Sequence, residues 1–226
     1  MPPNSNSITS SSSKPPNPPK DIQQITPSKR LSSIAAHLAP PAAEMSDSVR
    51  DSNKSEPYLP LAGLTRDGYS NDKEATATCY CGAVQLAFPT EGPGLAMTFV
   101  CNCTDCRKIT ASMFASNFTV DDKYLKHLRG QANLKQSGQS DTIASGHKMT
   151  NFFCQTCGTL MYRVGAIAPG YSILRLGTVD DFNLVETKLK PQHEIFVKDR
   201  VSWFKGAEIE GIKQHEGAFP RRKRVE

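Results

Sequence analysis

The sequence predicts a mainly β domain built from several short antiparallel strands with little helix, and three observations support this fold class. Apolar and polar residues alternate over short stretches between residues 74 and 213, as in 83–88. Glycine, proline and other turn-forming residues separate these stretches. Closely spaced cysteines lie at the ends of several stretches, where a bound metal ion can tie short strands together.

The domain is expected to begin near Glu74 with a hairpin. One strand leads into Cys79, and the alternating residues 83–88 form the returning strand, which Pro89 ends. The turn between them is Cys79-Tyr80-Cys81-Gly82. Glycine tolerates a positive φ, so Gly82 allows both thiols to face one point. The hairpin therefore offers a pair of metal ligands.

A second cysteine group follows the strand predicted over residues 95–100, and it reads Cys101-Asn102-Cys103-Thr104-Asp105-Cys106. Three thiols can hold zinc while leaving its fourth position open. Residues 107–111 predict about one turn of helix, whose N-terminal amides favour anionic sulfur. A rival interpretation makes this a second structural ion, completed by an outside ligand such as His147.

Further strands are predicted over residues 113–120, 133–136, 147–153, 160–164, 171–176 and 194–197, while residues 124–128 are ambiguous. Residues 180–182 predict a turn. Residues 201–204 are expected to pack across the sheet, with Trp203 as a core aromatic residue.

The third cysteine group, Cys154 and Cys157 before Gly158, follows the strand predicted over residues 147–153. Together with Cys79 and Cys81 it completes a closed set of four zinc ligands. Since 72 residues separate Cys81 from Cys154, a shared ion would connect distant parts of the domain. A closed zinc site of this kind contributes on the order of 10 kcal/mol to folding. All seven cysteines are then used, and two zinc ions per chain are expected.

Composition divides the chain into residues 1–73, 74–213 and 214–226. The first segment holds 11 of the 16 prolines and is expected to be disordered, and the last is expected to be a flexible basic tail. The net charge of +5 is spread over all three segments. Without a concentrated basic stripe, nucleic acid is not an expected partner.

A reducing compartment suits an odd number of cysteines in metal-ligand spacings, so we expect a cytoplasmic protein. The sequence contains no run of 18 or more apolar residues, so we expect no membrane span. No apolar stretch follows a basic start, so we expect no secretory signal peptide. Two alternatives stay open: the basic residues 221–224 resemble a nuclear-import signal, and residues 1–44 share features with a mitochondrial presequence. Met45 is a second candidate start.

Between residues 75 and 206 the chain resembles the glutathione-dependent formaldehyde-activating enzyme family, which also includes centromere protein V. The resemblance depends on the three cysteine blocks in order, on Arg107, and on the segment from Pro191 to Phe196 followed by Arg200 and Trp203. One departure is Glu194, where many members have histidine.

The resemblance implies a β-tent fold with two zinc ions. It implies that the structural ligands are Cys79, Cys81, Cys154 and Cys157, and that the catalytic ligands are Cys101, Cys103 and Cys106. It also implies carbon–sulfur lyase activity on glutathione or other thiol adducts such as S-hydroxymethylglutathione. Arg107 would either steer a glutathione carboxylate or act as a structural counterion. The alternative function is a non-catalytic, zinc-stabilised module that binds a protein partner.

Overall fold

The computed structural model describes residues 48–220, which form a mainly β structure with little helix, as predicted. The strands are β1 (Glu74–Thr78), β2 (Gln85–Pro89), β3 (Leu95–Cys101), β4 (Ala115–Asp121), β5 (Lys126–Arg129), β6 (Leu134–Gln139), β7 (Met149–Cys154), β8 (Leu160–Gly165), β9 (Tyr171–Arg175), β10 (His193–Ile195) and β11 (Lys213–His215). The helices in this part of the chain are α2 (Thr104–Thr110) and α3 (Phe182–Glu186), with short 3-10 turns at η2 (Gly92–Gly94), η3 (Gln131–Asn133), η4 (Leu176–Thr178) and η5 (Val197–Asp199).

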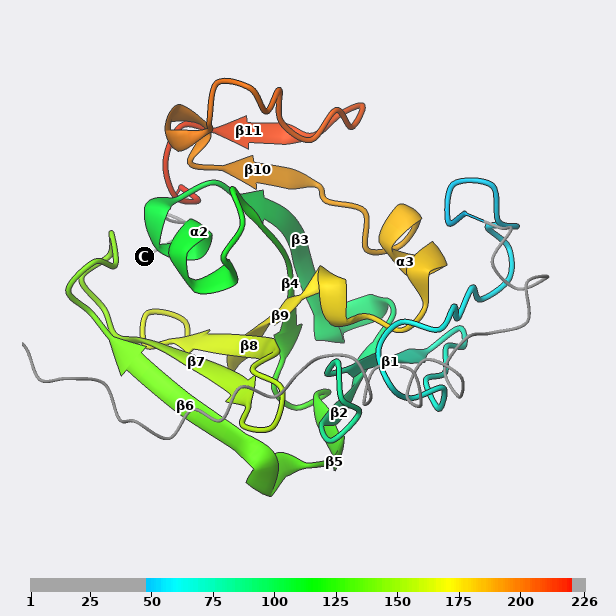
Figure 1. Cartoon of the computed structure of the whole chain (residues 1–226). Coiled ribbons are helices and arrows are strands. Elements are labelled where there is room, and N and C mark those ends of the chain that lie inside the picture. The colour runs from blue at the N-terminus through cyan, green and yellow to red at the C-terminus, as the bar shows by residue number, and fades with distance from the viewer. Residues whose placement is uncertain (1–47, 221–226) are drawn as a thin grey trace, which may run out of the picture. The chain divides into compact units, whose positions relative to one another are not determined.

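These strands form two sheets (Figure 1). The smaller has the order β1-β2-β5, and the larger has the order β11-β10-β3-β4-β9-β8-β7-β6. Most pairs are antiparallel, as predicted. However, β10 pairs in parallel with both β3 and β11. A connection through α3 leads into β10, and residues 196–212 connect β10 to β11.

The main core lies between the two sheets. Leu86 and Phe88 on β2 and Phe118 and Leu174 on the larger sheet are fully buried, and the Phe88 and Phe118 rings lie 4.7 Å apart. Side chains alternate across a strand, so the neighbours of Phe118 in β4 point to the opposite face. That opposite face carries a second, smaller cluster around Phe99, Cys101 and Cys106.

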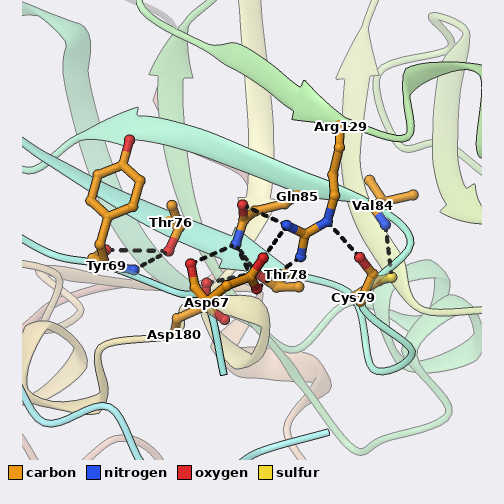
Figure 2. Close-up of polar contacts among 10 residues, drawn as sticks. Asp67, Tyr69, Thr76, Thr78, Cys79, Val84, Gln85, Arg129 and Asp180 are labelled. Atoms are coloured by element: carbon orange, nitrogen blue, oxygen red, sulfur yellow. Dashed lines mark hydrogen bonds and ion pairs between the residues drawn. The ribbon is translucent and has the colours of Figure 1, made fainter. Parts of the chain in front are cut away.

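Arg129 makes several hydrogen bonds to the smaller sheet near the β1–β2 turn (Figure 2). From β5, its Nε donates to the Gly82 carbonyl at 2.7 Å, and its guanidinium also pairs with the Asp67 carboxylate and with Gln85 Oε1. Gln85 in turn donates to Thr78 Oγ1 at 3.0 Å. One side chain therefore connects β5, the β1–β2 turn and the segment that precedes β1.

The segment before β1 contacts the domain over its described part, residues 48–73. Ser52 donates to Asn183 Oδ1 at 2.6 Å, and the Tyr58 amide donates to the Asp181 carboxylate at 3.0 Å. The predicted domain limits stay a prediction. The basic residues 221–224, the suggested presequence and Met45 lie outside the described residues.

Several elements differ from the sequence predictions. Residues 180–182 were predicted as a turn, but Asp181 caps α3 by accepting from the Asn183 amide. The strand predicted over residues 194–197 is not the last, because β11 follows it. Trp203 was predicted to be a core aromatic residue, and this is wrong: it is 70% exposed. No helix in residues 48–220 has the length and apolar character needed to span a membrane.

Candidate metal centres

The β1–β2 and β7–β8 turns bring four thiols together. Cys79 and Cys81 come from the first turn, and Cys154 and Cys157 come from the second. The four Sγ atoms all lie within 4.8 Å of one another, although Cys81 and Cys154 are 73 residues apart in sequence. We call this set the four-cysteine group.

The geometry of the four-cysteine group fits zinc. Its Sγ–Sγ distances include 3.6 Å between Cys79 and Cys81 and 3.7 Å between Cys81 and Cys154. Four sulfurs about 2.3 Å from a central zinc, at tetrahedral angles, would lie about 3.8 Å apart. An all-sulfur donor set that leaves no position open is typical of structural zinc.

Hydrogen bonds tune these thiols. The Val84 amide donates to Cys79 Sγ at 3.2 Å (Figure 2), and burial raises the pKa of Cys79 to about 12. Burial also acts to raise the pKa of Cys157, but hydrogen bonds with Thr159 and Cys81 together outweigh it and lower that pKa to about 6. Each turn ends in glycine with positive φ, at Gly82 (78°) and Gly158 (76°), which confirms the predicted role of Gly82.

A second group of three thiols lies on the opposite face of the larger sheet. Cys101 ends β3, Cys103 caps α2, and Cys106 lies in the first turn of α2, with all three Sγ atoms within 4.8 Å of one another. Cys103 Sγ accepts from the Cys106 amide at 3.3 Å. Because this sulfur acts as the helix cap, α2 begins at Thr104 rather than at the predicted residue 107. We call this set the three-cysteine group.

Two buried arginines face the three-cysteine group. Arg163 on β8 donates to Cys106 Sγ at 3.4 Å and pairs with Asp105 at 2.8 Å. Arg175 on β9 is 6% exposed and donates to Asn117 Oδ1. Contacts with the Cys101 and Cys103 thiols, followed by the charges of Arg163 and Arg175, lower the pKa of Cys106 well below its usual value. Negative charge on sulfur is therefore favoured at Cys106.

Asn102, between Cys101 and Cys103, is fixed by a hydrogen bond to a buried carboxylate on β10. Asn102 is fully buried, and its side-chain amide donates to Glu194 Oε1 at 2.9 Å. Glu194 is also fully buried and pairs with Arg200 at 2.9 Å. Glu194 is thus a buried carboxylate that holds Asn102 in place and does not line the cavity beside the thiols.

The three-cysteine group opens into a cavity of about 790 Å³. The sheet face, α2, the β6–β7 and β8–β9 loops, and the chain after β10 form its walls. Asp105, which lies between Cys103 and Cys106 in sequence, connects α2 to the end of β6 and the β6–β7 loop. Its carboxylate accepts from Gln139 at 3.2 Å and from Thr142 at 3.0 Å. Three thiols at one side of a cavity leave room for another group beside a bound ion.

The sequence model of the family described as "Glutathione-dependent formaldehyde-activating enzyme" matches residues 74–199, which is more than half of the chain. This protein belongs to that family. All seven cysteines of both groups fall inside the matched region. No curated protein matches the chain. Among solved structures it is similar to a Rhodobacter sphaeroides structural-genomics target at 21% identity, covering 46% of this chain and 85% of that chain, with a TM-score of 0.34.

In this member of the glutathione-dependent formaldehyde-activating enzyme family, the structure brings together the seven cysteines in the two groups that the sequence indicated. His147, the suggested fourth ligand, is exposed and does not join the three thiols within the described residues. Arg107 does not line the cavity: its guanidinium contacts the Asp199 carbonyl at 3.5 Å and Met113 Sδ at 3.6 Å.

Sequence reasoning missed Arg163, Arg175 and the pair of Glu194 with Arg200. A signal for the first two was present, because Arg163 lies inside the mostly apolar β8 and Arg175 directly follows the apolar pair Ile173-Leu174 at the end of β9. A charge at such a position requires a buried partner. The sequence could not show that the partner of both arginines is the three-cysteine group.

Proposed function

We propose that this protein is an enzyme that forms or breaks the carbon–sulfur bond of a thiol adduct, with zinc held by Cys101, Cys103 and Cys106. The observation that supports this proposal is that these three thiols open into a large cavity. The four-cysteine group would hold a second, structural zinc. A binding module would need no such cavity, and this favours the enzyme over the alternative.

The reaction is a reversible addition of a thiol to an aldehyde. In the forward direction the sulfur forms a bond with the carbonyl carbon, the carbonyl π bond breaks, and the thiol proton ends on the oxygen. The same step in reverse releases the thiol and the aldehyde. A zinc ion with an open position would supply a Lewis acid that lowers the pKa of a thiol placed beside it.

The residues around the centre have separate tasks in this proposal. Arg163 and Arg175 offset the excess negative charge of three thiolates around a divalent ion. Apolar walls exclude bulk water, which strengthens the electrostatic interactions inside the cavity. We also propose a cytoplasmic location, because thiols that serve as metal ligands persist in a reducing compartment.

The test combines metal analysis with turnover of a thiol–formaldehyde adduct. The purified protein should hold two zinc ions per chain, and Cys103→Ala should hold one and lose turnover by about 100-fold or more. Circular dichroism controls for folding, because the four-cysteine group is intact in this variant. Unchanged turnover in Cys103→Ala would reject the three-cysteine group as the catalytic site.

A further inference from the structure

We propose that the thiol handled at the three-cysteine group carries a bulky apolar group and lacks the charged arms of glutathione. This inference rests on the proposed function and narrows its substrate class. The family is named for glutathione, so the proposal departs from what the name suggests. It depends on the chemistry of the cavity walls.

Apolar side chains dominate the cavity. Met97 and Phe99 on β3 and Ile173 on β9 line its sheet side. Ile143 in the β6–β7 loop and Phe219 after β11 line other walls. The cavity volume of about 790 Å³ falls within the range of about 300–1,000 Å³ that holds drug-sized ligands. It therefore has room for a substrate much larger than formaldehyde.

The charges in the cavity do not suit glutathione. Four charged residues line it, namely Asp105, Arg163, Lys198 and Asp199, so acids and bases are equal in number. Arg163 is already engaged by Asp105 and Cys106. Lys198 is exposed, which leaves its charge well solvated.

Glutathione carries two carboxylates, and a desolvated carboxylate requires a cationic or multiply hydrogen-bonding partner. Among residues 48–220, those that line the cavity provide no pair of arginines free to bind two carboxylates. Arg163, the arginine that lines the cavity, is already used by Cys106 and Asp105 and is not free to bind a substrate carboxylate as well. An anionic substrate would therefore bind at a cost that an apolar one avoids.

The cavity rim points to the same class of substrate. Ile167 and Tyr171 line the cavity, yet they are 50% and 41% exposed. Large apolar side chains at the mouth of a pocket gain free energy when a ligand covers them. A substrate with an apolar body would bury both residues while its sulfur reached Cys101, Cys103 and Cys106.

The experiment compares two thiols on the zinc-loaded full chain. Phenylmethanethiol and glutathione are each titrated by calorimetry, and each is then assayed for catalysed exchange with formaldehyde. Both are primary thiols, so the ratio of their dissociation constants reports the attached group. We expect phenylmethanethiol to bind at least tenfold more tightly and to be the better substrate.

The outcomes separate the two proposals. Equal or tighter binding of glutathione, or no binding of either thiol, overturns the apolar substrate class. Tenfold tighter binding of phenylmethanethiol without turnover of either thiol supports the substrate class and counts against the enzymatic function. Preferred turnover of glutathione overturns the substrate class and leaves the enzymatic function standing.

Rim variants give a second, independent readout. Ile167→Lys should weaken phenylmethanethiol binding by about tenfold and reduce its preference over glutathione, and Ile143→Lys should act in the same direction from another loop. Leu128→Lys places the same charge at a residue of β5 that is 44% exposed and does not line the cavity. This control should bind both thiols as the unmodified chain does, and equal effects at all three positions would overturn the proposal.

Discussion

Buried charge is the main feature of this protein at the residue scale. Glu194 is fully buried, and Arg163 and Arg175 are each less than a tenth exposed. A charge removed from water is tolerated only when it is paired and hydrogen-bonded. Glu194 and Arg163 meet this condition through ion pairs and through contacts with Asn102 and Cys106. Arg175 donates to the neutral Asn117 side chain and has the Cys106 thiol as its nearby negative group.

Removing Arg200 should destabilise the domain strongly. Arg200→Met leaves Glu194 as a buried carboxylate without its cation, which typically costs about 3–5 kcal/mol of the free energy of unfolding. The double variant Glu194→Gln with Arg200→Met should recover part of that loss, because no charge is then buried unpaired. Urea denaturation of the unmodified chain, both single variants and the double variant measures both effects, and costs that add in the double variant would contradict the pairing.

Tyr69 gives a prediction for alkaline pH. Its hydroxyl donates to Glu74 at 2.5 Å, and this hydrogen bond to a carboxylate raises the pKa of Tyr69 to about 12 from an ordinary value of 10.0. The folded state thus holds the proton more tightly than the unfolded state. The contribution is complete below pH 10 and is lost as the pH rises toward 12.

The measurement for Tyr69 is the free energy of unfolding between pH 8 and pH 12. Tyr69→Phe cannot ionise, so the difference in stability between it and the unmodified chain should shrink above pH 10. Tyr162, whose pKa burial also raises to about 12, is present in both proteins and cancels in the comparison. A difference that stays constant across this range would show that the hydrogen bond does not shift the titration.

At the scale of elements, two tight turns position the thiols of the four-cysteine group. In both, the last cysteine is followed by a glycine with nearly the same positive φ, at Gly82 and Gly158. Their surroundings differ: a Cβ at Gly82 would lie 2.0 Å from Thr65 Cγ2, whereas a Cβ at Gly158 would meet nothing within 4 Å. The two turns therefore offer a matched comparison of backbone strain and packing.

Gly158→Ala should cost about 1 kcal/mol of the free energy of unfolding, which is the penalty for an L side chain at positive φ. Gly82→Ala should cost more, because the Thr65 side chain must also move. Thermal or urea unfolding of both variants with zinc bound gives the two values. Equal costs would mean that the Thr65 side chain moves away from the new methyl group without a measurable loss of stability.

The order and positions of most strands could be predicted because alternation and turn residues are local signals. The hairpin around Cys79, the strand ending at Cys101 and both cysteine groups were all visible in the sequence. The parallel pairing of β10 with β3 could not be seen in the sequence. It joins residues about ninety positions apart, and only three residues of each strand take part. Likewise, nothing local shows that Arg163 and Arg175 reach the thiols from two neighbouring strands.

At the scale of the described domain, the two cysteine groups lie on opposite faces of the larger sheet and have different consequences. The four-cysteine group joins the β1–β2 turn of the smaller sheet to the β7–β8 turn of the larger one. The thiols of the three-cysteine group all come from one local stretch, from the end of β3 into α2, so an ion held by them would not join elements distant in sequence. Under the proposed function, stability and chemistry would therefore depend on separate metal centres.

This separation predicts unequal effects of losing each ion. Cys154→Ser should unfold the domain or lower its stability severely, since a closed four-thiolate zinc site contributes on the order of 10 kcal/mol to folding. Cys101→Ser should leave the fold in place, because Cys101 belongs to the three-cysteine group, and should remove only the zinc of the cavity.

Circular dichroism and zinc content of the two variants, followed by stepwise chelation of the unmodified chain, distinguish the centres. Chelation should release one ion without a change in the far-ultraviolet spectrum, and loss of the second ion should coincide with unfolding. If both ions left together with the fold, or if Cys154→Ser kept a native spectrum with a single zinc, the four-cysteine group would not be the connection that holds the two sheets.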